Sequence, residues 1–457
     1  MILCKILIAL GIPIFLGISF IKYIEKDKKL LPLLRIPIGF GLGFGFLTQW
    51  MLLLSIVHIK YSLLTIGGPL LLAGFFFSLK NYFKSKSQKY ISQKTFQNKQ
   101  KTQSFFGSVL DSGLTLYIAY IICFVWIRGL TVPILEWDAI SWIALKGKIF
   151  FYEKSIYQHA YLPNSAYPLH VPLSLTWIAL NLGEWSEVLV KIIFPAYFTT
   201  YCWLHCGIMR FYLNKLWAKG SLALLVSASF FNYHATIAYR DIVMMFYFCS
   251  GILVILLWNK TKNNSLLLIS ALFFGFASFV KLEGAIYMGI GLLMLSFVYT
   301  KKTSLKTYHK WLNLLWTCLI PTTIFLFYYV YKIIIGATHA NQNLNITFSS
   351  ATLLQSFDLL KIFLNELLLS ANWHIIWFLF LLSIFQFKKI RSSFELHILI
   401  GAILLFFGVY FTLGSITGLY VSLAGVDTSS VLPRILLHIY PLAVFFIALV
   451  NGDSKTI

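Results

Sequence analysis

Charged residues are scarce in this chain of 457 residues, and acidic ones are the scarcest. Asp, Glu, Lys and Arg make up 11% of the sequence, whereas they make up about a quarter of an ordinary soluble domain. Hydrophobic residues account for 59%, more than a soluble protein could keep away from water. This composition excludes a soluble globular protein and indicates a protein embedded in a lipid bilayer.

Other features that are missing narrow the class further. The apolar runs do not alternate with polar residues, which argues against a membrane β-barrel. No Gly-x-x-x-x-Gly-Lys-Ser/Thr pattern occurs, so direct use of a nucleoside triphosphate has no support. No small-residue cleavage site follows the apolar stretch 1–20, so we expect an uncleaved first helix. All the cysteines lie in apolar runs, where we expect them to be packing residues: Cys4, Cys123, Cys202, Cys206, Cys249 and Cys318.

The net charge of +22 comes from 37 basic residues against 15 acidic ones. The basic residues lie in short loops between apolar runs and do not form one continuous stretch. This arrangement is typical of the positive-inside rule in multi-pass membrane proteins. We therefore expect a membrane partner and no nucleic-acid partner.

Apolar runs of membrane-spanning length recur along the whole chain. A helix needs about 20 such residues to cross about 30 Å of hydrocarbon. We divide the chain into N-terminal helices with a basic loop, residues 1–106, and a transmembrane core, residues 107–450. The sequence predicts an all-helical protein with about 13 transmembrane helices, near 2–21, 33–57, 62–79, 107–127, 188–208, 220–238, 242–258, 264–280, 284–300, 311–332, 372–387, 394–413 and 434–450.

The segment 80–101 sets the orientation, because it contains seven Lys and no acid and is therefore expected in the cytoplasm. The apolar stretch 170–182 would be only about 20 Å long as a helix, too short to cross. Counting it as a span would also place most of the basic loops outside. We therefore expect 170–182 to lie in or dip into the membrane interface, within one long external loop, 129–187. A second external loop covers 333–371.

With this orientation, two thirds of the acidic residues fall on the external side. They are Glu136, Asp138, Glu153, Glu184, Glu187, Asp241, Glu283, Asp358, Glu366 and Asp427. Long ordered loops at one end of a rigid helical bundle are usual places for function. The sequence therefore predicts a site on the non-cytoplasmic face.

The first candidate site residues are Glu136 and Asp138, just after the fourth span. Two carboxylates at this spacing can share a divalent cation such as Mg²⁺ or Mn²⁺. One of them can instead take a proton from an acceptor hydroxyl. An ordinary acidic interfacial loop is the alternative interpretation.

Two short external turns carry further candidates. Arg240 and Asp241 lie in the first, where an unpaired charge at the membrane boundary is costly. An Arg–Asp pair that closes the turn is the alternative to an acid aimed into a cavity. Lys281 and Glu283 lie in the second turn, where helix capping by Glu283 is an equally good explanation.

Arg434 precedes the last span in the stretch Pro433 to His438. An arginine at headgroup depth can bind a lipid phosphate through two parallel hydrogen bonds. It can also be a simple interface anchor. Lys146 and Lys148 are rival phosphate ligands in the long loop.

The order of these motifs resembles the GT-C superfamily of membrane glycosyltransferases, particularly the protein-mannosyltransferase and aminoarabinose-transferase branch. Glu136-Trp137-Asp138 looks like the acidic motif of that family's first large external loop. Tyr167-Pro168 and the following Val171-Pro172-Leu173 resemble its interfacial part. Arg240-Asp241, Lys281 to Gly284 and the late Arg434 match in order and spacing over 107–450. One departure is that four spans precede the acidic loop here, where the family usually has one.

The resemblance implies a fold, a reaction and a set of roles. The reaction is inverting transfer of a sugar from a polyprenyl-phosphate donor to a lipid, glycan or protein acceptor. The location is a bacterial inner membrane with the site facing the periplasm or exterior. Asp138 would be the base, helped by Asp241 and Glu136. The other implied contacts are Arg434, Lys146 and Arg240 to the donor phosphate, and Glu283, Lys281, Tyr167 and His170 to the substrate.

Other classes of function stay open at this stage. A transporter or flippase would place ionisable residues at the membrane midplane and show inverted repeats. A glycan polymerase or ligase of the O-antigen type would depend more on Arg and His residues of the loops. A non-catalytic assembly subunit with the GT-C fold is a further alternative.

Overall fold

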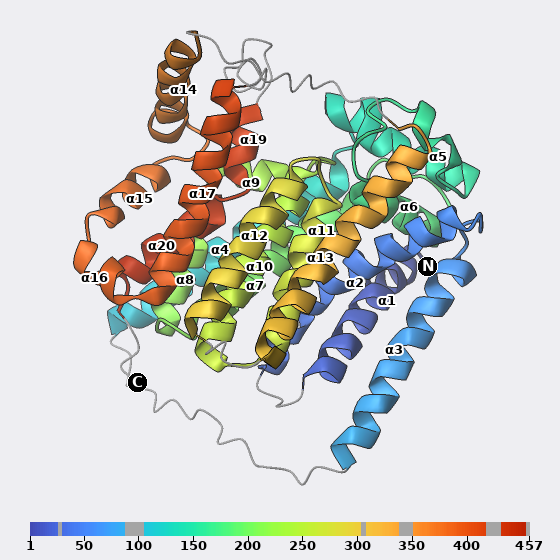
Figure 1. The fold of residues 1–457 in the computed structure, drawn as a ribbon, viewed down its shortest axis with the longest axis horizontal. Helices are drawn as coiled ribbons and strands as arrows, with labels where there is room; N and C mark the ends of the chain where they lie inside the picture. Colours follow the sequence, from blue (N-terminus) through green and yellow to red (C-terminus); the bar gives the residue numbers. More distant parts are fainter. Residues whose placement is uncertain (26–29, 87–104, 303–307, 338–350, 417–430, 454–457) are drawn as a thin grey trace.

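The computed structural model describes residues 1–25, 30–86, 105–302, 308–337, 351–416 and 431–453, and every regular element in these ranges is a helix (Figure 1). Eight helices are long and apolar enough to cross a bilayer. The expected all-helical, multi-pass membrane class is confirmed. These helices are α1 Ile2–Ile24, α2 Pro32–Ile56, α3 Leu63–Lys86, α4 Phe105–Thr131, α10 Asp241–Thr261, α12 Gly284–Lys302, α13 Tyr308–Ile334 and α17 Phe394–Ile416.

A ninth span is formed if two consecutive helices are counted together. Helices α19 Val431–Leu437 and α20 Tyr440–Asn451 pass the test as a pair, with a bend of 47° between them. Pro441 lies in the first turn of α20. A backbone N–H at this position has no hydrogen-bond partner within the helix, so proline is tolerated there and favours the start of a new helix. Because of this bend, α19 points in a different direction from α20, and most of its side chains are buried in the bundle.

The remaining helices are shorter. They are the π-helical turn Ala139–Ile143, α5 Ala144–Glu153, the 3₁₀ turn Tyr157–Tyr161, α6 His170–Leu182, the 3₁₀ turn Leu189–Ile192, α7 Ile193–Met209, α8 Lys215–Leu225, α9 Ser229–His234, α11 Ser265–Ser278, α14 Ala351–Leu368, α15 Ile376–Ile384 and α16 Phe387–Ser392. The first four belong to the predicted external loop 129–187, so that loop is mainly helical. The second predicted loop, 333–371, contains α14, and its residues 338–350 lie outside the described ranges.

The predicted number of 13 spans is not confirmed. The stretch 220–238 is divided between α8 and α9, because the helix stops at Leu225 and restarts at Ser229. The stretches 188–208, 264–280 and 372–387 form helices of 17, 14 and 9 residues. At about 1.5 Å per residue these helices are shorter than about 30 Å of hydrocarbon.

Helix α10 lies at the centre of the bundle. Every residue of α10 from Asp241 to Asn259 is buried, and the helix packs against α7, α11, α12 and α17. An isolated membrane span would present much of its surface to lipid, so α10 is enclosed by protein. Its first residue, Asp241, therefore lies at the end of the central helix, within reach of the segments that begin or end there.

Helices α1 and α2 pack against the rest of the chain, and α3 packs mainly against α1. A side chain at Gly17 would collide with the Gly39 carbonyl oxygen, so only glycine allows α1 and α2 to approach this closely. Trp177 of α6 donates from Nε1 to the Ala9 carbonyl oxygen at 2.7 Å, and Lys5 Nζ donates to the Leu182 carbonyl oxygen at 2.5 Å. The extra helices thus support α6, all of whose residues are buried.

Candidate active site

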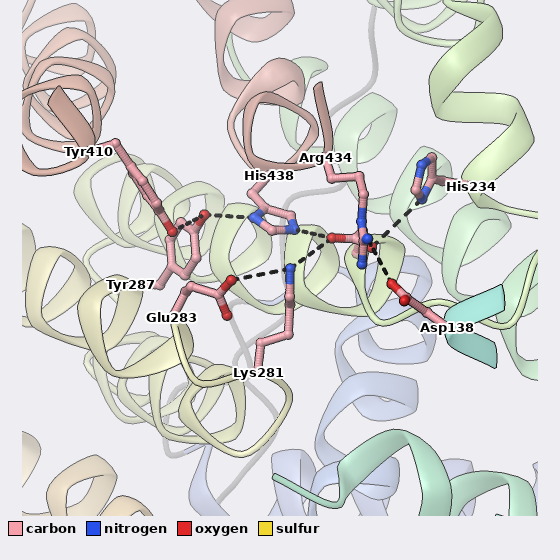
Figure 2. Close-up of polar contacts among 9 residues, drawn as sticks. Asp138, His234, Lys281, Glu283, Tyr287, Tyr410, Arg434 and His438 are labelled. Atoms are coloured by element: carbon pink, nitrogen blue, oxygen red, sulfur yellow. Dashed lines mark hydrogen bonds and ion pairs between the residues drawn. The ribbon is translucent and has the colours of Figure 1, made fainter. Parts of the chain in front are cut away.

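Asp241 is the centre of a polar network at the first turn of α10 (Figure 2). Its carboxylate has no solvent exposure. The Oδ1 atom accepts hydrogen bonds from Lys281 Nζ at 3.0 Å and from His438 Nε2 at 3.1 Å, and Oδ2 accepts one from Arg434 Nε at 3.1 Å. The N-terminus of a helix also favours a negative charge. A buried carboxylate with this many donors is held ionised and fixed in orientation.

Arg434 joins Asp241 to the long loop. Its Nη1 donates to Asp138 Oδ2 at 2.8 Å, while its Nε remains on Asp241. The Asp138 side chain is 25% exposed, so this acid is the accessible one of the two. One guanidinium therefore bridges two of the three carboxylates that the sequence proposed as catalytic.

Asp138 is positioned by an unusual local structure. It precedes the π-helical turn Ala139–Ile143, a geometry that is rare and frequently found at functional sites. Trp142 in that turn donates from Nε1 to Asp138 Oδ1 at 3.4 Å. The two oxygens of Asp138 thus contact different partners, Trp142 and Arg434.

The network extends away from Asp241 on two sides. Lys281 lies 3.5 Å from Glu283 Oε1 as well as 3.0 Å from Asp241. Burial favours the neutral form of Glu283, but the charge of Lys281 acts in the opposite direction and the pKa of Glu283 is lowered overall. The sequence-predicted residues Asp138, Asp241, Lys281, Glu283 and Arg434 are therefore brought together in one site.

His438 carries the second extension. Its Nδ1 lies 2.6 Å from the Tyr287 hydroxyl, and Tyr410 donates to that hydroxyl at 3.2 Å. A carboxylate only accepts, so the contact with Asp241 places a hydrogen on Nε2 of His438. The other ring nitrogen, Nδ1, then accepts from Tyr287. The chain of donors thus runs from Tyr410 through Tyr287 and His438 to Asp241.

Arg240 does not pair with its neighbour Asp241, so the expected alternative of an Arg–Asp pair closing the turn is wrong. Its guanidinium lies instead over the ring of Trp142, 4.1 Å from the centroid, and 5.1 Å from that of Tyr167. Only 1% of Arg240 is exposed. It therefore belongs to a second, adjacent cluster that shares Trp142 with the acidic network.

Lys146 belongs to the same second cluster. It is completely buried, and its Nζ donates to the Asn164 carbonyl oxygen at 2.7 Å. Burial, and to a smaller extent the nearby charge of Arg240, lower the pKa of Lys146 to about 6. Its rival Lys148 is exposed and pairs with Glu187 at 3.1 Å.

Two of the predicted site residues lie elsewhere. Glu136 accepts a long contact of 3.4 Å from the Leu135 backbone N–H and has no ion pair within the described ranges. His170 is fully buried, with Nδ1 at 2.9 Å from the Thr48 hydroxyl and Nε2 at 2.9 Å from the Tyr197 hydroxyl. Both nitrogens of His170 are thus engaged in holding helices together and are not available to a substrate.

A divalent cation does not fit the arrangement of these acids. Between Asp138 and Asp241 lies the guanidinium of Arg434, and Glu136 is not part of the network. Across the residues that the structure describes, no group of three or more His, Cys, Asp or Glu side chains is arranged to hold a metal ion. We derive no step that uses a metal.

Comparison with known protein families, with curated proteins and with solved structures finds no match to this chain. The resemblance to the GT-C superfamily therefore stays a hypothesis that depends on motif order. Any inference about function therefore depends on the geometry of the site alone.

Sequence reasoning missed Trp142 and His438 as parts of the site. His438 lies four residues after Arg434, which places both on one face if the helix is continuous. That spacing is a signal that the sequence did contain. The signal for Trp142 was weaker, since an aromatic residue near a membrane boundary is common.

Proposed function

We propose that this protein is an inverting glycosyltransferase of the GT-C type, which moves a sugar from a polyprenyl-phosphate donor to a lipid, glycan or protein acceptor. The observation that carries the proposal is the double contact of Arg434. It unites an accessible acid of the long loop, Asp138, with a buried acid of the central helix, Asp241. A structural ion pair needs only one of these acids. Two acids and several cations at one end of the bundle suit a reaction that moves a proton and releases an anion.

In the proposed reaction, an acceptor hydroxyl oxygen attacks the anomeric carbon of the donor sugar. The bond between that carbon and the phosphate oxygen breaks, and the polyprenyl phosphate leaves with the electron pair. Asp138 takes the hydroxyl proton, and a single displacement inverts the anomeric carbon. Carboxylates beside the reacting carbon stabilise its oxocarbenium-like charge.

Asp241, Lys281 and His438 would act through their neighbours. Asp241 holds Arg434 by one nitrogen, so that another nitrogen of the same guanidinium is directed at Asp138. Lys281 and His438 fix the second oxygen of Asp241. These residues orient the base and keep the charge of the site balanced.

The proposed location is the non-cytoplasmic face of a bacterial inner membrane. Asp241 begins α10, Glu283 directly precedes α12, Arg434 lies within the short helix α19, and Asp138 follows the end of α4. The basic segment 80–101 begins in the last turns of α3, whose other end is at Leu63. A transporter would be expected to place such residues near the middle of its spans.

The test compares cells that contain the protein, cells that lack it and cells that contain Asp138→Asn. We expect the strain without the protein to accumulate a polyprenyl-phosphate sugar and to lose one sugar from an envelope glycan, lipid or protein. Asp138→Asn should reproduce both changes although the protein is present in normal amount. An unaltered profile without the protein would contradict the proposal. A lost sugar that Asp138→Asn restores would favour an assembly subunit or a transporter.

A further inference from the structure

Six buried polar atoms near Lys146 have no hydrogen-bond partner among the described residues. Three are the guanidinium nitrogens of Arg240, two are the ring nitrogens of His159, and one is the hydroxyl of Ser165. Arg240 is 1% exposed, and the other two residues are not exposed at all. Buried polar groups are nearly always paired, so a group of six unpaired atoms on neighbouring side chains requires an explanation.

These side chains are close enough to act on each other. Lys146 donates to the carbonyl oxygen of Asn164, the residue just before Ser165. Burial, and then the charges of Lys146 and Arg240, hold the pKa of His159 well below its ordinary value, against a smaller opposite effect of the Ser165 backbone. The cluster thus contains two basic side chains and a neutral imidazole around one region of the loop 129–187.

Among the described residues, no carboxylate is in direct contact with this cluster, although Glu283 and Asp138 are near enough to act on Arg240. Within the described ranges, neither Arg240 nor Lys146 has an ion pair with Asp or Glu within 4.0 Å. The aromatic faces of Trp142 and Tyr167 stabilise the guanidinium only partly. The cost of burying a charge without a hydrogen-bonded anion exceeds the stabilisation that such ring contacts provide.

We propose that Arg240 and Lys146, with His159 and Ser165, form a binding site for the phosphate group of a lipid phosphate. An arginine side chain presents two parallel N–H donors to two phosphate oxygens. Lys146, whose pKa burial lowers to about 6, adds a third donor, and the negative charge of a bound phosphate favours its protonated form. Stacking on Trp142 fixes the plane of the guanidinium before the ligand arrives. This inference rests on the proposed function, to which it adds the place of the donor phosphate.

The site is separate from Arg434, which the sequence favoured as the phosphate ligand. The positive charge of Arg434 is already shared between two carboxylates at 2.8 and 3.1 Å. A phosphate there would compete with both of them and repel both. Arg240 has no such competitor, although it is next to Asp241 in the sequence.

The shared residue Trp142 sets the relation between phosphate and base. Its ring carries Arg240 on one face, and its Nε1 donates to Asp138. A phosphate bound by Arg240 would therefore lie beside the residue that positions the base.

The test is binding to purified protein in detergent, measured as the shift of the thermal unfolding midpoint. The probes are geranylgeranyl phosphate, geranylgeraniol and inorganic phosphate at constant ionic strength. We expect geranylgeranyl phosphate to raise the midpoint of the wild-type protein and geranylgeraniol to have no effect. Arg240→Met should raise the half-saturating concentration at least about tenfold, as expected for a lost charge-assisted hydrogen bond. Lys148→Met, in helix α5 beside Lys146, is the control removal of a positive charge and should bind like wild type.

Arg240→Met also reports on the empty protein. Met preserves an apolar stem over Trp142 and removes the unpaired charge, so we expect its midpoint without ligand to equal or exceed that of wild type. If this variant fails to fold, Arg240→Lys serves instead and should bind more weakly than wild type. A shift by inorganic phosphate alone would support the site and identify free phosphate as its source of ligand.

Two results would overturn the inference. One is that neither geranylgeranyl phosphate nor inorganic phosphate shifts the thermal unfolding midpoint of the wild-type protein. In that case only water would hydrogen-bond to the cluster. The other is an Arg240→Met protein that binds geranylgeranyl phosphate like wild type. Binding can be tested separately from sugar transfer, because the Asp138→Asn protein should still bind geranylgeranyl phosphate. A wild-type protein that binds the lipid phosphate but transfers no sugar would contradict the transfer and leave the site intact.

Discussion

Arg434 Nη1 and Asp138 Oδ2 lie 2.8 Å apart although 296 positions separate the two residues in the sequence. The contact joins the segment after α4, which three further helices precede, to the short helix α19 near the C-terminus (Figure 1). The Nε of the same guanidinium contacts Asp241 at 3.1 Å. Any change of Arg434 therefore acts on a buried and an accessible acid together.

Arg434→Met is expected to lower the thermal unfolding midpoint of the protein. Asp241 has no solvent exposure, and removing one partner of a buried ion pair costs about 3–5 kcal/mol. Because Asp241 keeps its contacts to Lys281 and His438, we expect the destabilisation to lie near the lower end of this range. The measurement is thermal unfolding in detergent, followed by intrinsic fluorescence.

The coupling between Arg434 and Asp241 is tested by the double variant. Arg434→Met with Asp241→Asn should be less destabilised than the sum of the two single changes, because each single change leaves the other charge unpaired. Arg434→Met combined with Glu136→Gln is the control pair, because Glu136 lies outside the network. If the midpoint change of the double variant equals the sum of the changes in the Arg434→Met and Asp241→Asn single variants, the contact contributes nothing to stability.

Asp138→Asn is expected to reduce sugar transfer by at least the roughly 10²–10⁴-fold of a lost acid–base group. Asparagine keeps the size of the side chain and one oxygen for Arg434, but it cannot accept the proton. The side chain is 25% exposed, so its thermal midpoint should change little. Transfer is measured with purified protein in nanodiscs and the lipid-linked donor that accumulates in cells without the protein.

Glu136→Gln is the matched comparison, two residues away in the same loop. It contacts only the Leu135 backbone N–H, so we expect transfer to fall much less than in Asp138→Asn. Near-normal turnover in a well-folded Asp138→Asn protein would remove this residue from the mechanism. Equal losses in both variants would assign the effect to the loop and not to the base.

The long spans could be predicted from the sequence because their apolar length is a local property. Helices α1, α2, α4 and α10 lie close to the predicted ranges for this reason. The break within 220–238 could not be predicted, since the residues between Leu225 and Ser229 are as apolar as their surroundings. Packing against neighbouring helices decides whether such a stretch continues as one helix.

The candidate site was only partly predictable. Asp138, Asp241 and Arg434 stood out because ionisable residues are rare in this chain. Which cation would meet which acid depends on contacts across 193 and 296 positions, which no local pattern encodes. The sequence analysis expected Arg434, Lys146 and Arg240 all to contact a phosphate, whereas the structure pairs Arg434 with two carboxylates and gives Arg240 no hydrogen-bond partner.

Cysteine labelling tests the proposed orientation. Tyr161 is 85% exposed in the long loop, and Ser392 is exposed at the end of α16. In intact cells, Tyr161→Cys should react with an impermeant thiol reagent, and Ser392→Cys should react only after permeabilisation. These sites lie on opposite sides in the topology derived from basic residues.

The labelling background lacks Cys4 and Cys123, the two exposed native cysteines, which are replaced by Ser. Protein without any added cysteine gives the remaining background signal. Labelling of Ser392→Cys alone in intact cells would reverse the orientation and place the candidate site in the cytoplasm.

The last prediction concerns pH and Lys146. Burial lowers the pKa of Lys146 to about 6 in the folded protein, whereas the unfolded chain returns it to its ordinary value of 10.5. Between these two values the unfolded chain binds one proton more, so Lys146 destabilises the fold increasingly as pH falls, by up to about 1.4 kcal/mol per pH unit. Lys146→Met removes this effect. Its thermal midpoint should therefore exceed that of wild type more at pH 6.5 than at pH 9.5, whereas Lys148→Met should show no such trend. Parallel curves for wild type and Lys146→Met would show that Lys146 keeps its charge in the fold, as it would beside a permanently bound anion.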